Sequence, residues 1–173
     1  MVASSEAGQT VVRRLGEPGD LGWVVMAHGE LYVEEFGWDT DFEGFVARIV
    51  ADYAAVSGRR GTAAWIAELE GERVGCVFCV PDPDDPDAAK LRILLVHPRA
   101  RGHGLGGRLV DTCVAFARDA GFERMRLWTN HPLVAARSIY LARGFALTGE
   151  ERHHSFGVDL VGQSYELELS PSR

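Results

Sequence analysis

The sequence predicts a mixed α/β protein whose elements follow the order β-αα-ββ-β-α-β-α-ββ. Three observations support this class. The short apolar run Leu91–Val96 is typical of a strand covered on both faces. Amphipathic stretches of helical period lie before and after it. Apolar runs separated by Gly or Pro account for the other strands. Because two helices follow one another directly, the order does not fit a doubly wound sheet.

Residues 1–9 are small and polar and predict a loose tail, and we expect residues 10–173 to form a single domain. The acidic stretch 81–87 is expected to be a solvated loop, and Asp20 to cap the first helix. The strands are expected at Thr10–Leu15, Thr62–Glu70, Arg73–Val80, Leu91–Val96, Arg124–Asn130, about Phe145–Glu151 and Gln163–Leu169. The helices are expected at Leu21–Glu35, Asp41–Val56, Leu105–Ala120 and Pro132–Arg143.

Composition excludes several classes of protein. A net charge of −7 over 173 residues argues against general nucleic-acid binding, which favours basic surfaces. No run approaches the roughly 18 apolar residues of a membrane span, and the first ten residues have no signal-peptide core. We therefore expect a cytoplasmic protein with no membrane partner.

Two features could suggest a metal site, and we expect none. Cys76 and Cys79 form a C-x-x-C inside a predicted strand, where residues three apart point to opposite faces. His153 and His154 are adjacent on another strand, so they also diverge, and no third ligand is evident.

A basic, glycine-rich turn follows the central strand. Its sequence, ARGHGLGGR, contains four glycines, which let the backbone approach a ligand closely. The free N–H groups of the helix that follows point into the same loop. The turn therefore predicts a phosphate-binding site.

Three motifs compete for this turn. Gly102, Gly104 and Gly107 satisfy the dinucleotide pattern G-x-G-x-x-G, but the next strand ends in Leu-Trp-Thr-Asn, without the required acid. A nucleotide P-loop would need Gly-Lys-Ser/Thr after the loop, which is absent. The third pattern, Arg101-x-x-Gly104-x-Gly106, resembles the pyrophosphate loop of the GNAT acetyltransferase superfamily. A NAD-binding protein remains a rival only through the first pattern.

The resemblance to GNAT acetyltransferases extends from residue 10 over nearly the whole chain. The order of elements agrees, and so does Ile139-Tyr140-x-x-x-Gly144-Phe145 at the end of the last helix. More narrowly, the stretches GWVVMAHGELYVEEFGWD, ARGHGLGGRLV, LWTN and EERHHSFGVDLVGQSYELEL resemble the acetyltransferase half of bacterial MarR–GNAT fusion proteins. Those relatives carry an N-terminal DNA reader for which we expect no room here, so no nucleic-acid partner is expected.

The resemblance implies a central strand splayed from its neighbour, with acetyl-CoA entering the gap as acetyl donor. Backbone groups of the central strand would pair with the pantetheine arm, and an N–H there, assigned to Leu95, would stabilise the oxyanion. The residues implied in cofactor binding are Leu94, Leu95, Val96, Arg101, Gly102, His103, Gly104, Leu105, Gly106, Gly107, Asn130 and Tyr140.

For catalysis, Tyr140 matches the superfamily tyrosine that protonates the departing CoA thiolate. The general base is open, because the central strand lacks the glutamate that many relatives have there; Glu35, Glu43, His153 and His154 are candidates, of which Glu35 is carried forward. Arg92 would favour an acceptor with a carboxylate. The residues expected around the acceptor are Tyr32, Glu35, Trp38, Glu43, Arg92 and His154.

The function expected from the sequence is acetyl transfer from acetyl-CoA to the amine of a small molecule or amino-acid-like acceptor, by direct attack in a ternary complex. The alternative from another class is a non-catalytic acyl-CoA-binding sensor or interaction module. The expected partners are acetyl-CoA and a small amine-bearing acceptor, and a homodimer is left open.

Overall fold

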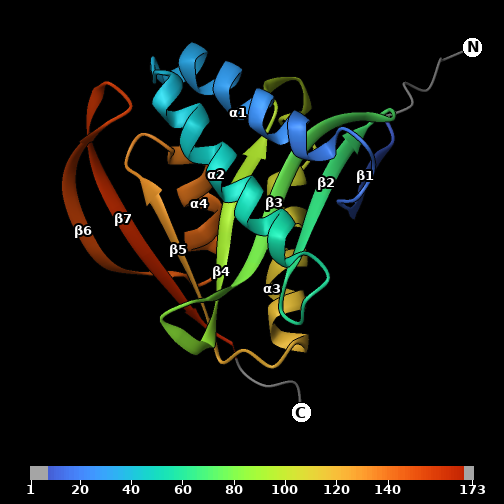
Figure 1. Ribbon diagram of the computed structural model, residues 1–173, viewed down its shortest axis with the longest axis vertical. Coiled ribbons are helices and arrows are strands. Elements are labelled where there is room, and N and C mark those ends of the chain that lie inside the picture. Colours follow the sequence, from blue (N-terminus) through green and yellow to red (C-terminus); the bar gives the residue numbers. More distant parts are fainter. Residues whose placement is uncertain (1–7, 170–173) are drawn as a thin grey trace, which may run out of the picture.

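A computed structural model describes residues 8–169 and contains one seven-stranded sheet with strand order β1-β2-β3-β4-β5-β7-β6. Helices α1 and α2 cross one face of the sheet, while α3 and α4 lie behind it (Figure 1). The strands are β1 (Thr10–Arg14), β2 (Ala63–Leu69), β3 (Glu72–Asp82), β4 (Asp85–Val96), β5 (Arg124–Asn130), β6 (Ala146–Ser155) and β7 (Val158–Glu168). The helices are α1 (Asp20–Phe36), α2 (Thr40–Val56), the short 3₁₀ helix η1 (Pro98–Ala100), α3 (Leu105–Asp119) and α4 (Val134–Ala142).

Each face of the sheet has its own hydrophobic core. On one face α1 and α2 pack against Phe78 and Cys76; on the other, α3 packs against Val77 and Cys79. The two cysteines therefore point to opposite faces, as the strand period requires. Both are free and fully buried, which agrees with a packing role.

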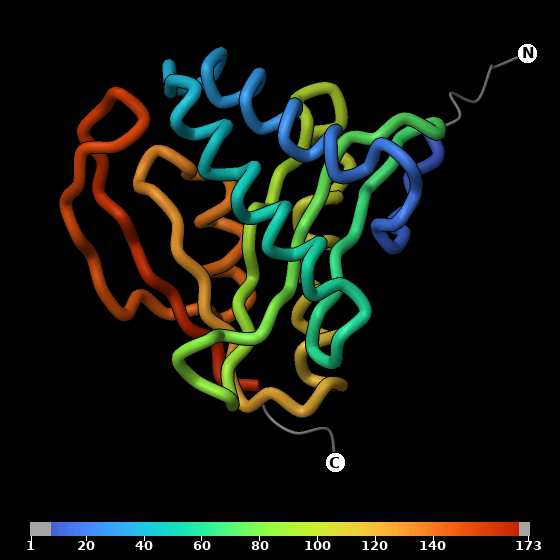
Figure 2. Tube along the Cα trace, in the orientation of Figure 1, coloured from blue at the N-terminus to red at the C-terminus, as the bar shows by residue number. Residues whose placement is uncertain are grey.

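The middle of the sheet is forked. β4 and β5 pair in parallel only at Ala88, Ala89 and Lys90, opposite residues 124–126, and beyond this point no pairing joins them. Figure 2 shows strands β4 and β5 diverging from that end. On its other side β4 carries a bulge against β3, where Ile93 has a φ of +45°. The mixed sheet and the splayed central strand expected from the sequence are both present.

Asp20 does not cap α1. Gly19 takes the N-cap position with a φ of +90° and no side-chain cap. The Asp20 carboxylate is fully buried and accepts hydrogen bonds from Arg13, at 2.8 and 2.9 Å, and from Arg73, at 2.8 Å. The N–H groups of residues 16 and 17 also donate to it. The sequence missed this cluster because Arg73 lies 53 residues away along the chain.

The acidic stretch 81–87 is mostly exposed to solvent, as expected, but it forms a tight β3–β4 turn in place of a loop. Asp82 pairs with Arg126 at 3.3 Å, while Asp85 pairs with Arg124 and Arg126, both at 3.0 Å. The turn therefore links β4 to β5 where the fork closes. Other boundaries also differ from expectation: β4 already begins at Asp85, α4 begins two residues after Pro132, and the last two strands are longer than predicted.

Candidate active site

The glycine-rich turn presents a row of free backbone donors at the N-terminus of α3. Within the described residues, the N–H groups of residues 102–107 donate to no backbone or side-chain acceptor. Gly104 caps the helix with a φ of +69° and no side-chain cap, and Gly102 has a φ of +87°, a left-handed conformation that favours glycine. Six consecutive free amides at a helix N-terminus form a site for an anion such as a pyrophosphate.

The other two glycines of the turn have a different reason. A Cβ at Gly106 would lie 2.7 Å from Cδ1 of Ile139, and one at Gly107 would meet the guanidinium of Arg143. Both contacts come from α4, so these glycines allow α3 and α4 to pack closely. Close approach of a ligand to all four glycines stays a prediction.

The basic residues around the turn are already engaged. Arg101 forms an ion pair with Glu35 at the end of α1, and Arg108 donates to Oγ1 of Thr10 at 2.8 Å. Arg99 reaches the carbonyl of Arg73 at 3.3 Å. His103 is exposed beside the free amides. In this arrangement the backbone, more than the arginine side chains, is free to hold an anion.

A small cavity of about 70 Å³ occupies the fork between β4 and β5. It brings together five residues expected at the site from distant parts of the chain, namely Tyr32, Trp38, Leu94, Asn130 and Tyr140. Leu95 and Val96 do not line it; Leu95 pairs with Cys76 of β3, and its side chain packs in the core beneath α1 and α2. None of the fifteen side chains that line the cavity is Asp, Glu, Lys or Arg. The fork is thus an apolar chamber for uncharged groups.

Tyr140 is 4% exposed and packs against Phe145 with ring centroids 5.7 Å apart. Burial raises the pKa of its phenol above the ordinary value of 10, so the group keeps its proton at neutral pH. Its hydroxyl forms no hydrogen bond with any other residue in the range 8–169. Tyr140 therefore lines the cavity with a protonated hydroxyl that caps no backbone group of the described residues.

His28 also lines the cavity, although the sequence analysis did not place it among the site residues. It is 1% exposed, and its Nδ1 lies 2.7 Å from the carbonyl oxygen of Val24. Burial lowers the pKa of His28 to about 4, so the ring is neutral. A histidine among apolar helix positions was the available signal.

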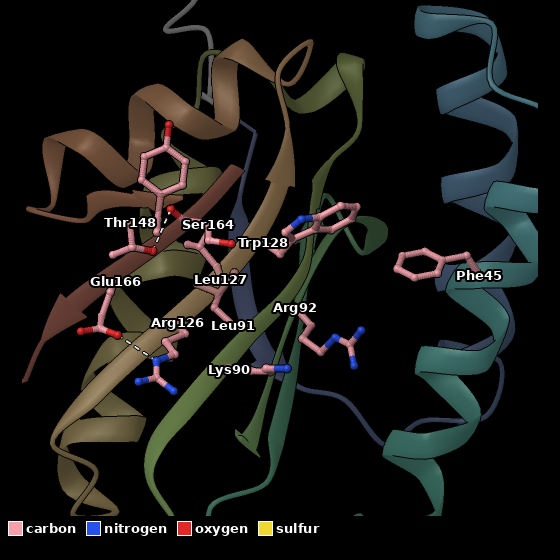
Figure 3. Close-up of a pocket in the computed structure, with 11 residues that line it drawn as sticks. Phe45, Lys90, Leu91, Arg92, Arg126, Leu127, Trp128, Thr148, Ser164 and Glu166 are labelled. Carbon is pink, nitrogen blue, oxygen red and sulfur yellow. Dashed lines mark hydrogen bonds and ion pairs between the residues drawn. The ribbon is translucent and has the colours of Figure 1, made fainter. Parts of the chain in front are cut away.

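A larger pocket of about 500 Å³ lies between α2 and strands β4, β5 and β7. Figure 3 shows Arg92 extending from β4 toward α2, with Phe45 facing it and Trp128 above. Phe45, Leu91 and Trp128 line both this pocket and the small cavity, so the two spaces adjoin.

Arg92 is the cation of this pocket that forms no direct ion pair, although the carboxylate of Asp52 on α2 lies near enough to favour its charged form. Lys90 lies 3.9 Å from Asp82, and Arg126 pairs with Glu166 at 2.8 Å. Arg92 forms no ion pair or hydrogen bond with any residue that the structure describes. Burial lowers the pKa of Arg92, because desolvation penalises the charged form.

Three residues expected around the acceptor lie elsewhere. Glu35 lines neither space and is paired with Arg101. Glu43 packs against α1 so closely that a Cβ at Gly29 would lie 2.6 Å from its Oε1. His154 is exposed and hydrogen-bonds to Asp159 at 2.8 Å. The structure therefore gives no support for contact of these three side chains with the acceptor.

The neighbouring His153 does approach the site. Its Nε2 lies 2.8 Å from Oδ1 of Asn130, and its ring is 5.4 Å from that of Trp128. Across residues 8–169, no cluster of three His, Cys, Asp or Glu side chains could hold a metal. None of the helices in that range combines the length and the apolar character needed to cross a bilayer.

Comparison with known proteins matches this architecture to a family. The model of the acetyltransferase (GNAT) family matches residues 26–145, which include both the amide-rich turn and Tyr140. The chain belongs to the acetyltransferase (GNAT) family. This confirms the family expected from the sequence, and it leaves the narrower resemblance to MarR–GNAT fusion proteins a prediction.

Two curated relatives are N-acetyltransferases. The chain is 36% identical to N-acetyltransferase 8B of Homo sapiens over 98 residues, covering 54% of this chain and 43% of that protein. It is 38% identical to N-acetyltransferase 8 of Rattus norvegicus over 94 residues, covering 53% and 42%. The chain thus matches less than half the length of these relatives.

Solved structures share the fold at low sequence identity. An N-acetyltransferase from Staphylococcus aureus Mu50 superposes with a TM-score of 0.77 at 17% identity, covering 94% of this chain and 99% of that one. The putative acetyltransferase yncA from Salmonella typhimurium, solved with its cofactor acetyl-CoA, has a TM-score of 0.75 at 19% identity, covering 93% and 94%. The fold is therefore that of GNAT acetyltransferases.

Proposed function

We propose that the protein is an acetyl-CoA-dependent N-acetyltransferase whose acceptor is a small amine carrying a carboxylate, such as an amino acid. Residues 10–173 act as one N-acetyltransferase domain. The observation that carries the choice of acceptor is Arg92, a half-buried guanidinium that lines the larger pocket and forms no direct ion pair or hydrogen bond with the described residues.

The donor is assigned from two features of the site. The six free amides of residues 102–107 hold the pyrophosphate of acetyl-CoA. The fork between β4 and β5 receives the pantetheine arm, because the backbone of β4 has no strand partner there beyond Lys90. The family and the acetyl-CoA complex of the yncA structure support the same donor.

The acceptor is assigned from charge. A desolvated cation is normally paired, so a ligand carboxylate on Arg92 would restore the missing partner. The larger pocket adjoins the cavity that Tyr140 lines, so an acceptor with its carboxylate at Arg92 can extend its amine into the fork. The apolar cavity favours the neutral amine, which is the form that attacks.

In the transfer, the amine attacks the thioester carbon directly in a ternary complex. A backbone N–H of β4, for which Leu95 remains the proposed residue, stabilises the oxyanion, and Tyr140 protonates the departing thiolate. Asn130 contacts the cofactor side of the fork. We assign no proton transfer to Glu35, because its carboxylate is engaged by Arg101.

The test is acetyl-CoA-dependent thiol release with amino acids, their carboxamides and simple alkyl amines as acceptors. We expect amino acids to be preferred. Arg92→Gln should raise the KM of a carboxylate-bearing acceptor about 10- to 100-fold, since hydrogen bonds to charged groups contribute about 1.5–3 kcal/mol. Arg48→Gln, which removes the same charge from an exposed site on α2, is the control and should leave KM unchanged.

Equal use of an amino acid and its carboxamide, or an unchanged KM in the Arg92 variant, would contradict the proposed acceptor. Acetyl-CoA binding without thiol release from any acceptor would favour the sensor alternative. We retain the cytoplasmic location and the kinship with MarR–GNAT fusion proteins as hypotheses; the free, buried state of all three cysteines fits a reducing compartment.

A further inference from the structure

One buried polar atom of the fork is left without a partner. Among the side chains of residues 8–169, Nε2 of His28 is the buried nitrogen or oxygen atom with no hydrogen bond. Leaving a buried acceptor unpaired is unfavourable, so an unpaired atom on a residue that lines a cavity points to a ligand group as its partner. His28 lies in the cavity shared with Tyr140, which makes the proposed substrates the natural source of that group.

The hydrogen bond at the other ring nitrogen determines which form of the imidazole is present. The carbonyl of Val24 can only accept, so Nδ1, 2.7 Å away, carries the ring proton. Nε2 is then an unprotonated lone pair. Stacking on Tyr32, with ring centroids 5.6 Å apart and planes 20° apart, holds the ring in this orientation.

The cavity offers few alternatives for accepting a proton. Its lining contains no carboxylate and no amine, and its other titratable groups are Tyr32 and Tyr140. Burial raises the pKa of both phenols, so they are proton donors at neutral pH. The indole nitrogens of Trp38 and Trp128 can only donate, so His28 supplies the only ring nitrogen with a free lone pair among the lining residues.

We propose that Nε2 of His28 accepts the proton of the attacking amine and is the general base of the acetyl transfer. This rests on the proposed function. As the N–C bond forms, one amine proton passes to Nε2; the C–S bond then breaks, and Tyr140 gives its proton to sulfur. Proton transfer from the imidazolium to the phenolate, through water, restores both residues. The oxyanion that forms beside the ring favours its protonated form during the reaction.

Two variants of His28 separate its functions. Asn at this position can keep the donor to Val24 but lacks the distal acceptor, whereas Gln offers an acceptor that takes up no proton. We expect kcat to fall about 10²- to 10⁴-fold in both His28→Asn and His28→Gln. The KM of the acceptor and the affinity for acetyl-CoA, measured by calorimetry, should change less than about threefold, because the free amides that bind the donor are not touched.

The matched control is Val46→Ala on α2, a fully buried residue of the same hydrophobic core that lines neither space of the site. It loosens the packing of the helix but keeps Nε2, so thermal stability should fall while kcat is retained. Nitrogen NMR of histidine-labelled protein gives a readout independent of turnover, and should find His28 neutral with its proton on Nδ1.

A His28 ring protonated at Nε2, or full kcat in either His28 variant, would overturn the inference. Loss of kcat in the Val46 control as large as in the His28 variants would also overturn it, because packing would then explain the effect. If wild-type protein binds acetyl-CoA but acetylates no amine, the proposed function fails; active wild type with equally active His28 variants contradicts only the role of His28.

Discussion

Replacing Tyr140 by phenylalanine removes only the phenolic oxygen, so its effect on catalysis can be measured apart from any effect on stability. The ring is buried and packed against Phe145, and a phenylalanine occupies the same space. The hydroxyl has no hydrogen-bond partner in the described part of the chain, so its removal breaks no internal bond. We therefore expect Tyr140→Phe to fold normally, with a melting temperature no lower than that of the wild type.

The expected catalytic loss is much larger. General acid catalysis contributes about 10²- to 10⁴-fold, which corresponds to about 2.7–5.4 kcal/mol of activation free energy. The assay is thiol release at saturating acetyl-CoA and acceptor, so that kcat is read without binding effects. Tyr53→Phe is the matched control: Tyr53 is also buried, but it lies against Phe78 outside both spaces of the site.

Full turnover in Tyr140→Phe, with the Tyr53 control also active, would refute the assignment of the acid. Loss of acetyl-CoA affinity in place of kcat would instead make the hydroxyl a binding group.

Asp20→Asn should cost about 3–5 kcal/mol of unfolding free energy, because it leaves Arg13 and Arg73 without their buried partner; urea unfolding measures this. The arginines hold the pKa of Asp20 well below its ordinary value, so its contribution is present above about pH 4 and is lost as pH falls below that, which an acid titration of wild type and variant should reproduce. A variant as stable as wild type, or equally acid-sensitive, would contradict this. Gly75→Ala should cost about 1–3 kcal/mol, since its Cβ would lie 2.8 Å from the carbonyl oxygen of Leu95, and unfolding at the wild-type denaturant midpoint would show that β4 yields there.

The sequence predicted the limits of a helix or strand well where residues next to it in the chain determine them. The limits of β5 coincide with the prediction, because the strand is bounded by a turn at Gly121 and by the Asn130–Pro132 segment. Asp20 was misjudged because its partners come from other strands. The ion pairs of the acidic turn were missed because its arginines, Arg124 and Arg126, follow some 40 residues later.

The same distinction applies to the site. The amide-rich turn and Tyr140 belong to contiguous motifs, so the sequence could identify them. The surroundings of Glu35 and His28 depend on contacts between α1 and segments far away in the chain. Glu35 meets Arg101, and His28 lines a cavity with residues of β4, β5 and α4. Glu35 looked available because nothing nearby in sequence pairs with it, whereas Arg101 does so from 66 residues away.

The acidic turn has a consequence for the fork. Only three residue pairs join β4 to β5, and the side chains that brace this junction are charged: Asp82 and Asp85 on one side, Arg124 and Arg126 on the other. The arginines are 24% and 37% exposed, so dissolved salt can screen them. Ion pairs near the surface thus hold the two halves of the sheet together where the fork begins. Higher ionic strength should weaken these ion pairs and loosen the junction between β4 and β5.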